Sequence, residues 1–357
     1  MTNHFDQHRT DLHTAGHAFD DDTLARLLLT TWHPPGSPTI EHLVQDRGAE
    51  RAARLLLDAP DDGVIAADAD ALELAQSVRS QLRLGQGPAR QIAEGFDFIK
   101  AHPTEVELLT PDHDLWPRRL NDLDVRTPLV LWARGDLELL GEWRTVNITG
   151  ARAATAYGEH VTSELTTQLA HRSQRIINNA SYGIDSSAQR TALANDPAPI
   201  IVTATGLDRS YPAGNADLLK RVAQRGLVIT EQPVGTPPTR LGIQNIQRLQ
   251  AALSHSTIVV EAGNRSSALH TAEEARLLGH FVGAVPGPVT SSASAGANRL
   301  LQTGTARVVT HAVDIPIVAS DPSVGPMTRE PLLLHHDAPH GAAHDAPLDI
   351  ASAARSL

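Results

Sequence analysis

The chain has 357 residues, a formal net charge of −11 and no cysteine. The lack of cysteine excludes disulfides, thiolate metal sites and cysteine nucleophiles. Apolar residues make up 41% and aromatic residues only 3%, so a sizeable core can form but must be largely aliphatic. Because the sequence shows neither a signal peptide nor an apolar run of membrane-spanning length, we expect a cytoplasmic protein without membrane contact.

The charge is distributed unevenly along the chain. Residues 146–309 carry more Lys and Arg than Asp and Glu, whereas the segments before and after them are acidic. The net negative charge by itself disfavours nucleic acid as a partner, but the local distribution is the stronger criterion. The basic excess of the middle segment is compatible with an anion-binding surface but does not by itself predict one.

The first part of the chain is predicted to be helical after a short tail. Residues 1–22 are polar and are expected to form a flexible tail. Residues 23–104 follow a helical periodicity, in which Leu24, Leu27 and Leu28 share one face. Short helices with tight turns predict a small domain of the SAM or helix-hairpin-helix kind. Its acidic composition favours docking or dimerisation, and direct DNA contact is the alternative.

From about residue 105 the pattern changes to short apolar strands that alternate with helices. A lead-in ends in a short strand at 128–136. Seven further strands are predicted at 146–149, 175–178, 199–204, 227–230, 257–260, 281–285 and 306–309. Helices are predicted at 157–170, 186–194, 215–224, 244–253, 267–278 and 297–302. This alternation predicts βαβ units, and thus an α/β, Rossmann-like domain over 105–315 with a mostly parallel sheet flanked by helices.

The last segment, residues 316–357, is rich in Pro, Ala and His. It has too few large apolar residues to fold alone, so a disordered, low-complexity tail is predicted. Its histidines could in principle bind a metal, but nothing orients their rings. Neither a metal nor a cofactor is therefore expected. The histidines in question are His335, His336, His340 and His344.

The first strand of the alternation is followed by Gly150-Ala151-Arg152 and then by a helix. In a parallel sheet this loop lies at the carboxyl edge and faces a helix N-terminus, where N–H groups and the helix dipole favour an anion. Gly150 allows close approach of the backbone, and Arg152 can bind phosphate through two hydrogen bonds. The alternative is a tight turn with a solvated arginine. The loop fits neither the G-x-G-x-x-G nor the Walker pattern.

Polar residues also follow most of the later strands. The second strand is followed by Tyr182-Gly183-Ile184-Asp185, in which Asp185 is a natural helix N-cap. Ser266-Ser267 and Gly296-Ala297-Asn298 follow later strands. A row of such loops predicts a polar groove along one edge of the sheet.

These motifs, in this order over residues 110–309, resemble the DNA-processing protein A family, also called DprA or Smf, and its actinobacterial members in particular. Gly150-Ala151-Arg152 resembles the G-[SA]-R loop of the family, and Tyr182-Gly183-Ile184-Asp185 resembles its second-strand motif. Further segments fall in the family's order, namely Tyr211-Pro212, Glu261-Ala262, Thr271-Ala272, Pro286-Gly287 and Gly296-Ala297-Asn298.

The resemblance implies a recombination mediator that binds and protects single-stranded DNA during transformation. Such a protein dimerises and helps to load RecA recombinase onto incoming DNA or onto DNA coated with single-strand-binding protein. It implies no catalysed reaction, so we do not expect an enzyme. Carried over by position, the implied DNA-binding residues are Gly150, Ala151, Arg152, Tyr182, Gly183, Arg240, Ile243, Arg248 and Asn298.

The chain departs from the family pattern at the start of one helix. The family's Phe-x-x-R-N-R is Ile243-Gln244-Asn245-Ile246-Gln247-Arg248 here. Without the aromatic ring, about 1–3 kcal/mol of base stacking is lost. Without the first arginine, the slope of the logarithm of DNA affinity against the logarithm of salt concentration becomes smaller by about one unit. These replacements predict weakened DNA binding or a divergent paralogue. A further alternative is a nucleotide-binding or nucleoside-monophosphate-hydrolysing protein, although the P-G-G-x-G-T-x-x-E signature is absent.

Overall fold

The structure is a computed structural model that describes residues 3–32, 35–67, 71–83, 88–102, 106–141 and 144–317. Nearly all of the predicted tail at 316–357, with its four histidines, lies outside these residues. The predictions for that tail are therefore not addressed by the structure.

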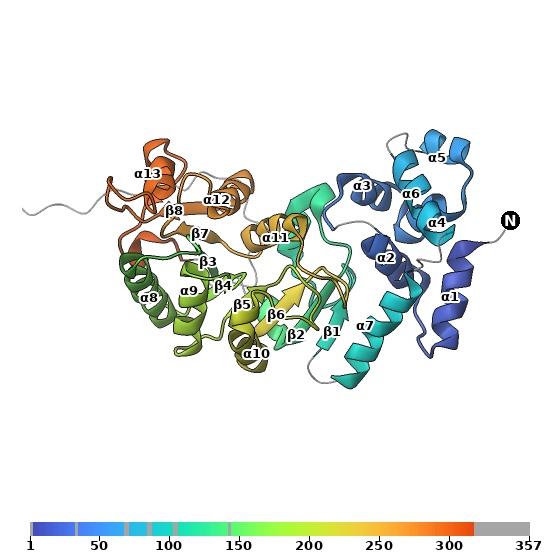
Figure 1. The fold of residues 1–357 in the computed structure, drawn as a ribbon, viewed down its shortest axis with the longest axis horizontal. Coiled ribbons are helices and arrows are strands. Elements are labelled where there is room, and N and C mark those ends of the chain that lie inside the picture. Colours follow the sequence, from blue (N-terminus) through green and yellow to red (C-terminus); the bar gives the residue numbers. More distant parts are fainter. Residues whose placement is uncertain are drawn as a thin grey trace, which may run out of the picture. The chain divides into compact units, whose positions relative to one another are not determined.

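A nine-stranded sheet runs through the described residues (Figure 1). Its order is β1-β2-β6-β5-β4-β3-β7-β8-β9, and the strands from β6 to β9 across the sheet are parallel. β1 and β2 are antiparallel to each other, and β2 is antiparallel to β6. The mostly parallel, Rossmann-like sheet is thus confirmed, with an antiparallel extension of which the sequence indicated only the second strand. The strands are β1 (Val106–Leu109), β2 (Leu131–Gly135), β3 (Thr145–Thr149), β4 (Arg175–Asn178), β5 (Ile200–Val202), β6 (Leu227–Thr230), β7 (Ser256–Val259), β8 (Phe281–Ala284) and β9 (Arg307–Val308).

Helices flank the sheet on two sides. In Figure 1, α8, α9 and α10 lie on one side, and α11, α12 and α13 lie on the other. All six match predicted helices, but α11 begins four residues early because the hydroxyl of Thr239 accepts a hydrogen bond from the N–H of Gly242 at 2.9 Å and caps the helix. Their bounds are α8 (Ala156–His171), α9 (Ile184–Leu193), α10 (Ala216–Arg225), α11 (Arg240–Ala252), α12 (Ala268–Leu277) and α13 (Ala295–Gln302).

Seven helices precede the sheet in the part of the chain that the structure describes, and the first of them corrects the prediction of a flexible tail at residues 1–22. Phe5 and Leu12 on α1 are buried, and the backbone N–H of His4 donates to the carboxylate of Asp58 at 2.7 Å. The apolar stripe of α1 is sparse, but its side chains recur at helical spacing and pack onto α4. The seven helices are α1 (His4–Thr14), α2 (Asp21–Trp32), α3 (Pro38–Arg47), α4 (Ala49–Asp58), α5 (Asp61–Ala67), α6 (Ala71–Arg83) and α7 (Ala89–Ala101).

The helical region and the sheet share one hydrophobic core. Side chains from α1 to α7 belong to the same buried cluster as Trp132 and Val228 of the sheet and Val130 just before β2. A Cβ atom on Gly95 of α7 would lie 2.7 Å from the indole of Trp132, so only glycine lets this helix approach the sheet so closely. The ring of Phe96 is 5.7 Å from that indole. The predicted boundary at 104 falls next to β1, but the two regions form one compact unit.

Candidate nucleic-acid interface

Two of the sequence motifs meet at the carboxyl edge of the parallel strands. The loop after β3 carries Gly150, Ala151 and Arg152, and the loop after β4 carries Gly183. Gly183 has φ of +76°, and a Cβ atom there would lie 2.2 Å from the carbonyl oxygen of Ala151. The N–H of Ile184 donates to the same oxygen at 3.2 Å. The structure therefore brings the two motifs into direct contact.

The loop after β3 presents a row of backbone donors. The N–H groups of residues 151–154 have no acceptor in the part of the chain that the structure describes. The side chain of Arg152 is exposed, and no ion pair involving it occurs among those residues. N–H groups without an internal acceptor can donate to an anion, and a guanidinium beside them can add two further hydrogen bonds. This loop is suited to binding phosphate.

The helix N-terminus contributes less to this site than the sequence suggested. Glu261, at the end of β7 and only 1% exposed, accepts hydrogen bonds from the N–H and the hydroxyl of Thr155 at 3.0 and 2.7 Å. A Cβ atom on Gly158 would lie 2.2 Å from this carboxylate, so glycine is required in the first turn. Because a carboxylate already neutralises the positive end of α8, the anion site is confined to the loop before the helix.

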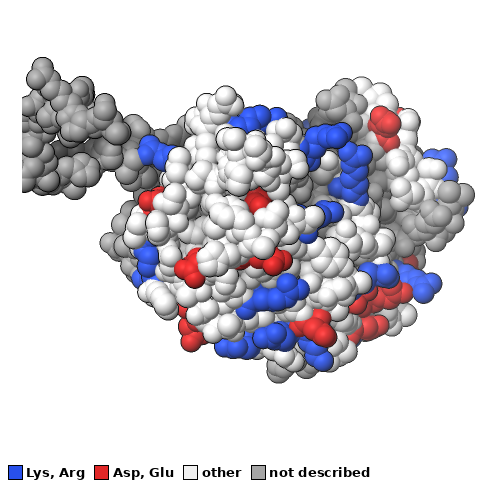
Figure 2. Space-filling model, turned by 60° about the vertical axis from the view of Figure 1, so that its left-hand side comes forward, with Lys and Arg blue, Asp and Glu red and all other residues white. Residues whose placement is uncertain are grey.

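Both buried acids and exposed arginines follow the strands at this edge. Asp185, Glu231 and Glu261 are each 2% exposed or less. Arg152 after β3, Arg240 at the start of α11 and Arg265 after β7 are exposed instead. In Figure 2, basic side chains gather on part of the surface with few acidic ones among them, while elsewhere the two kinds are mixed. An acidic chain can thus still offer a basic surface to a ligand. Arg265 was missed in the sequence, although its place after a parallel strand would have identified it.

Arg248 does not belong to this exposed surface, which corrects its assignment as a DNA-binding residue. Its guanidinium is 4% exposed and forms a two-point ion pair with Glu231, with N–O distances of 2.8 and 2.6 Å. Its Nε also donates to the carbonyl oxygen of Arg126 at 2.9 Å. A Cβ atom on Gly36 would lie 3.0 Å from the guanidinium carbon. Arg248 therefore joins α11 to the helical region from a fully enclosed position.

The replaced family positions on α11 are also largely enclosed. Ile246 and Gln247 are 2% and 5% exposed, and Ile243 is half-buried against the aliphatic cluster beneath it. The predicted weakening of DNA binding assumed that all three face the ligand. Ile246 and Gln247 therefore lie on the enclosed side of α11, and weakened DNA binding through their replacement stays a prediction.

The carboxyl group of Glu41 lies close to the ion pair between Arg248 and Glu231, so its titration can test whether this region is buried. Burial raises the pKa of Glu41 to about 8, and the charge of Glu231 acts in the same direction while Arg248 opposes it. The pKa of Glu41 in the folded protein lies above the ordinary value of 4.5, so protonation of this group stabilises the folded state. Its contribution to the free energy of unfolding is fully present below about pH 4.5 and is lost as the pH rises to about 8.

Glu41→Gln is therefore expected to gain stability relative to the unchanged protein between pH 5 and pH 9. The measurement is urea unfolding of both proteins at several pH values. Other titrating groups are common to both proteins and cancel in the difference. Parallel stability curves over this range would contradict an enclosed Glu41.

Two other residues predicted to bind DNA, Tyr182 and Asn298, differ in their surroundings. Tyr182 is 48% exposed, and its hydroxyl accepts a hydrogen bond from the N–H of Gly214 at 3.2 Å, which fixes the ring against the 3-10 helix η3 (Ala213–Asn215). Asn298 instead bonds the backbone N–H and carbonyl of Gly287 at 3.1 and 3.0 Å. Its role is to fix the loop after β8. Tyr157, 40% exposed, is a second ring at this edge that the sequence did not single out.

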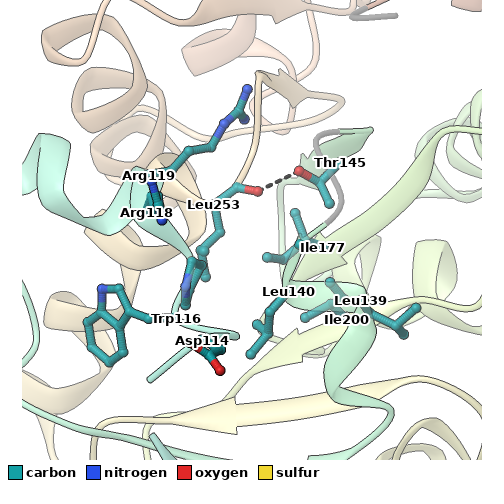
Figure 3. Close-up of a pocket in the computed structure, with 12 residues that line it drawn as sticks. Asp114, Trp116, Arg118, Arg119, Leu139, Leu140, Thr145, Ile177, Ile200 and Leu253 are labelled. Atoms are coloured by element: carbon teal, nitrogen blue, oxygen red, sulfur yellow. Dashed lines mark hydrogen bonds between the residues drawn. The ribbon is translucent and has the colours of Figure 1, made fainter. Parts of the chain in front are cut away.

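A separate cavity of about 210 Å³ opens at the opposite, amino edge of the sheet (Figure 3). It lies between the 3-10 helix η2 (Leu137–Gly141) and the first residues of β3 and β5, and its wall is mixed, with leucine and isoleucine side chains beside Asp114, Arg118 and Arg119. The hydroxyl of Thr145 at its rim is bound to the carbonyl oxygen of Leu253 at 2.5 Å. None of the predicted DNA-binding residues lines this cavity.

Candidate metal-binding clusters and membrane-spanning helices are absent from the described ranges. They contain no cluster of three or more His, Cys, Asp or Glu side chains placed to hold a metal ion. No helix within them is both long enough and apolar enough to cross a membrane.

Comparison with known proteins identifies the class. Residues 107–319, more than half of the chain, match the family described as DNA recombination-mediator protein A. The chain is 46% identical over 250 residues to a DNA processing protein DprA of Mycobacterium tuberculosis, covering 67% of this chain and 64% of that protein. It is 31% identical over 260 residues to DprA of Streptococcus pneumoniae, covering 68% of this chain and 89% of that protein. The protein belongs to the DNA recombination-mediator protein A family.

Two solved structures have a similar fold. The X-ray structure of DprA from Streptococcus pneumoniae shares the fold, with a TM-score of 0.65 at 24% identity over 83% of this chain and 96% of that one. The second structure is that of DNA processing protein A from Helicobacter pylori and concerns its single-stranded DNA binding mode. It gives a TM-score of 0.54 at 27% identity and covers 58% of this chain and 93% of that chain. The match to the mycobacterial relative spans somewhat less than two thirds of that relative's length.

Proposed function

We propose that the protein binds single-stranded DNA along the carboxyl edge of its sheet and acts as a recombination mediator. The observation that carries this proposal is the loop after β3, where the free N–H groups of residues 151–154 lie beside the exposed Arg152. Exposed Arg240 and Arg265 extend the basic surface on either side. Donors of this kind contact phosphate whatever the base, so binding would show little sequence preference.

The bases would find a stacking surface in Tyr182. Ile243 cannot replace the aromatic ring of the family motif, since it is aliphatic and packs onto the core. Tyr182 follows the neighbouring strand, is about half exposed, and precedes Gly183, which touches the phosphate loop. An aromatic ring near a phosphate-binding loop favours a single strand over a duplex, because only unpaired bases are free to stack on the ring.

We further propose that the protein protects incoming DNA in the cytoplasm, loads RecA during transformation and acts by binding, without catalysis. A homodimer is supported by the edge strand β9, both of whose residues are exposed, and by Val308 and Val313, which are 56% and 76% exposed. Hydrolysis of nucleoside monophosphates is not favoured. The glutamates at strand ends are already engaged, Glu261 by Thr155 and Glu231 by Arg248.

Titration of labelled oligonucleotides by fluorescence anisotropy tests the proposal. We expect an oligo(dT) strand to bind more tightly than a duplex of the same length. The logarithm of its affinity should fall with the logarithm of the salt concentration with a slope of about −2, since each phosphate contacted on a single strand contributes about −0.7. Arg152, Arg240 and Arg265 would supply three such contacts at this edge. Equal affinity for the duplex, or binding that does not depend on salt, would contradict a single-strand phosphate groove.

A further inference from the structure

A buried carboxylate lies directly beneath the phosphate loop. Asp185, in the first turn of α9, is 2% exposed, and the hydroxyl of Thr149 donates to it at 2.9 Å. The backbone N–H groups of Gly150 and Asn179 also stabilise its charged form. One side chain thus joins the end of β3, the first residue of the phosphate loop and the end of β4. Asp185 is not the helix cap that the sequence predicted, because Gly183 occupies that position.

The surroundings of Asp185 are polar but almost uncharged. The amide of Asn178 donates to the carbonyl oxygens of Ile148 and Asp185 at 2.9 and 3.1 Å and accepts from Gln189 at 3.0 Å. Arg152 is the charged group that acts on the carboxylate. No ion pair to Asp185 occurs among the described residues, so its charge is balanced mainly by dipoles.

The neighbouring charged side chains are engaged elsewhere. Arg190, further along α9, donates to Ser186 and Asn215 at 3.1 and 3.0 Å. Glu261, behind Gly150, is bound to Thr155. Burial raises the pKa of Asp185 to about 7, against the opposing effect of its hydrogen bonds and of Arg152. Both the charged and the neutral forms are therefore populated near neutral pH.

We propose that Asp185 is a positioning residue of the phosphate loop and that binding of a DNA phosphate is coupled to uptake of a proton by this carboxyl group. The inference rests on the proposed function. A phosphate held by residues 151–154 places negative charge next to the carboxylate and competes with it for Arg152. Like charges favour the neutral acid, so phosphate promotes protonation. Because such coupling is reciprocal, protonation strengthens phosphate binding.

The test is the affinity for an oligo(dT) strand between pH 5.5 and pH 8.5 at constant ionic strength. For the unchanged protein we expect affinity to fall about threefold to tenfold across neutral pH, the effect of one charge near a phosphate in a partly enclosed site. Asp185→Asn should remove this step. Glu159→Gln is the matched control, since it removes an exposed carboxylate from the first turn of α8 and should retain the step.

Two additional measurements test the coupling even if Asp185→Asn does not fold. Thr149→Val deletes a hydrogen bond that favours the charged form, so the step should move to higher pH. Calorimetry of the unchanged protein at pH 7, in two buffers that differ in ionisation enthalpy, should show proton uptake on binding. An identical pH step in Asp185→Asn, or no uptake, would overturn the coupling while leaving DNA binding intact. A folded protein that binds no oligo(dT) at any pH would refute the proposed function, and the coupling with it.

Discussion

Arg152→Ala is expected to weaken binding of single-stranded DNA by about tenfold or more and to leave the fold unchanged. A charged hydrogen bond to phosphate contributes about 1.5–3 kcal/mol, which corresponds to roughly 10–150-fold in affinity. The salt slope should also become less negative by about 0.7, because one phosphate contact is lost. Since the side chain is exposed, stability should change by no more than about 0.5 kcal/mol.

The matched control is Arg276→Ala on α12. Arg276 is also exposed and pairs with Glu273 on its own helix, with an N–O distance of 2.6 Å. It lies near the carboxyl end of that helix, away from the loops that follow the parallel strands. Anisotropy titrations should show no loss for this control. Equal losses in both variants would indicate a general effect of charge, and unchanged binding by Arg152→Ala would remove the loop from the DNA site.

Arg248→Met is expected to destabilise the protein by about 3–5 kcal/mol, because it leaves the fully buried Glu231 without its counter-charge. That is a large share of the stability of an ordinary domain. The loss should appear as a lower midpoint of urea unfolding. Where the variant is still folded, its affinity for oligo(dT) should match that of the unchanged protein, since the guanidinium does not reach the surface.

The double variant Arg248→Met, Glu231→Gln should recover part of the loss, since it removes the unpaired charge. Arg240→Met is the control at the start of the same helix. Its side chain is exposed, so it should lower DNA affinity and change stability by about 0.5 kcal/mol or less. If Arg248→Met weakened DNA binding and left stability unchanged, the role inferred for Arg248 from the family motif would be correct after all.

The sheet was readable in the sequence because its strands are short apolar runs bounded by polar turns. The strands at 175–178 and 227–230 agree with the structure to the residue. α1 was not recognised because its buried Phe5 and Leu12 are separated by polar residues, and the stripe becomes meaningful only when α4 covers it. β1 was missed for a similar reason, since a four-residue strand is defined by its partner more than by its own composition.

The location of the candidate site could be predicted from the sequence, but the orientation of several of its side chains could not. The rule that parallel strands end at one edge located Gly150, Arg152 and Gly183 together, and the structure brings them into contact. The direction in which a helical side chain points was not accessible in the same way. Arg240 and Arg248 lie on one helix, yet the first is exposed and the second is enclosed by a loop from the far end of the chain. That enclosure depends on tertiary packing, which a motif does not encode.

The shared core has a consequence for how the molecule can be divided. The segment that matches the family, residues 107–319, ends on the sheet side of a buried interface that includes Val130, Trp132 and Val228. Cut free from the helices before it, this segment would expose an indole and a patch of aliphatic side chains to water, and would be prone to self-association. The segment that matches the family model is therefore smaller than the unit of folding, and the N-terminal helices cover apolar side chains of the sheet that would otherwise be exposed to water.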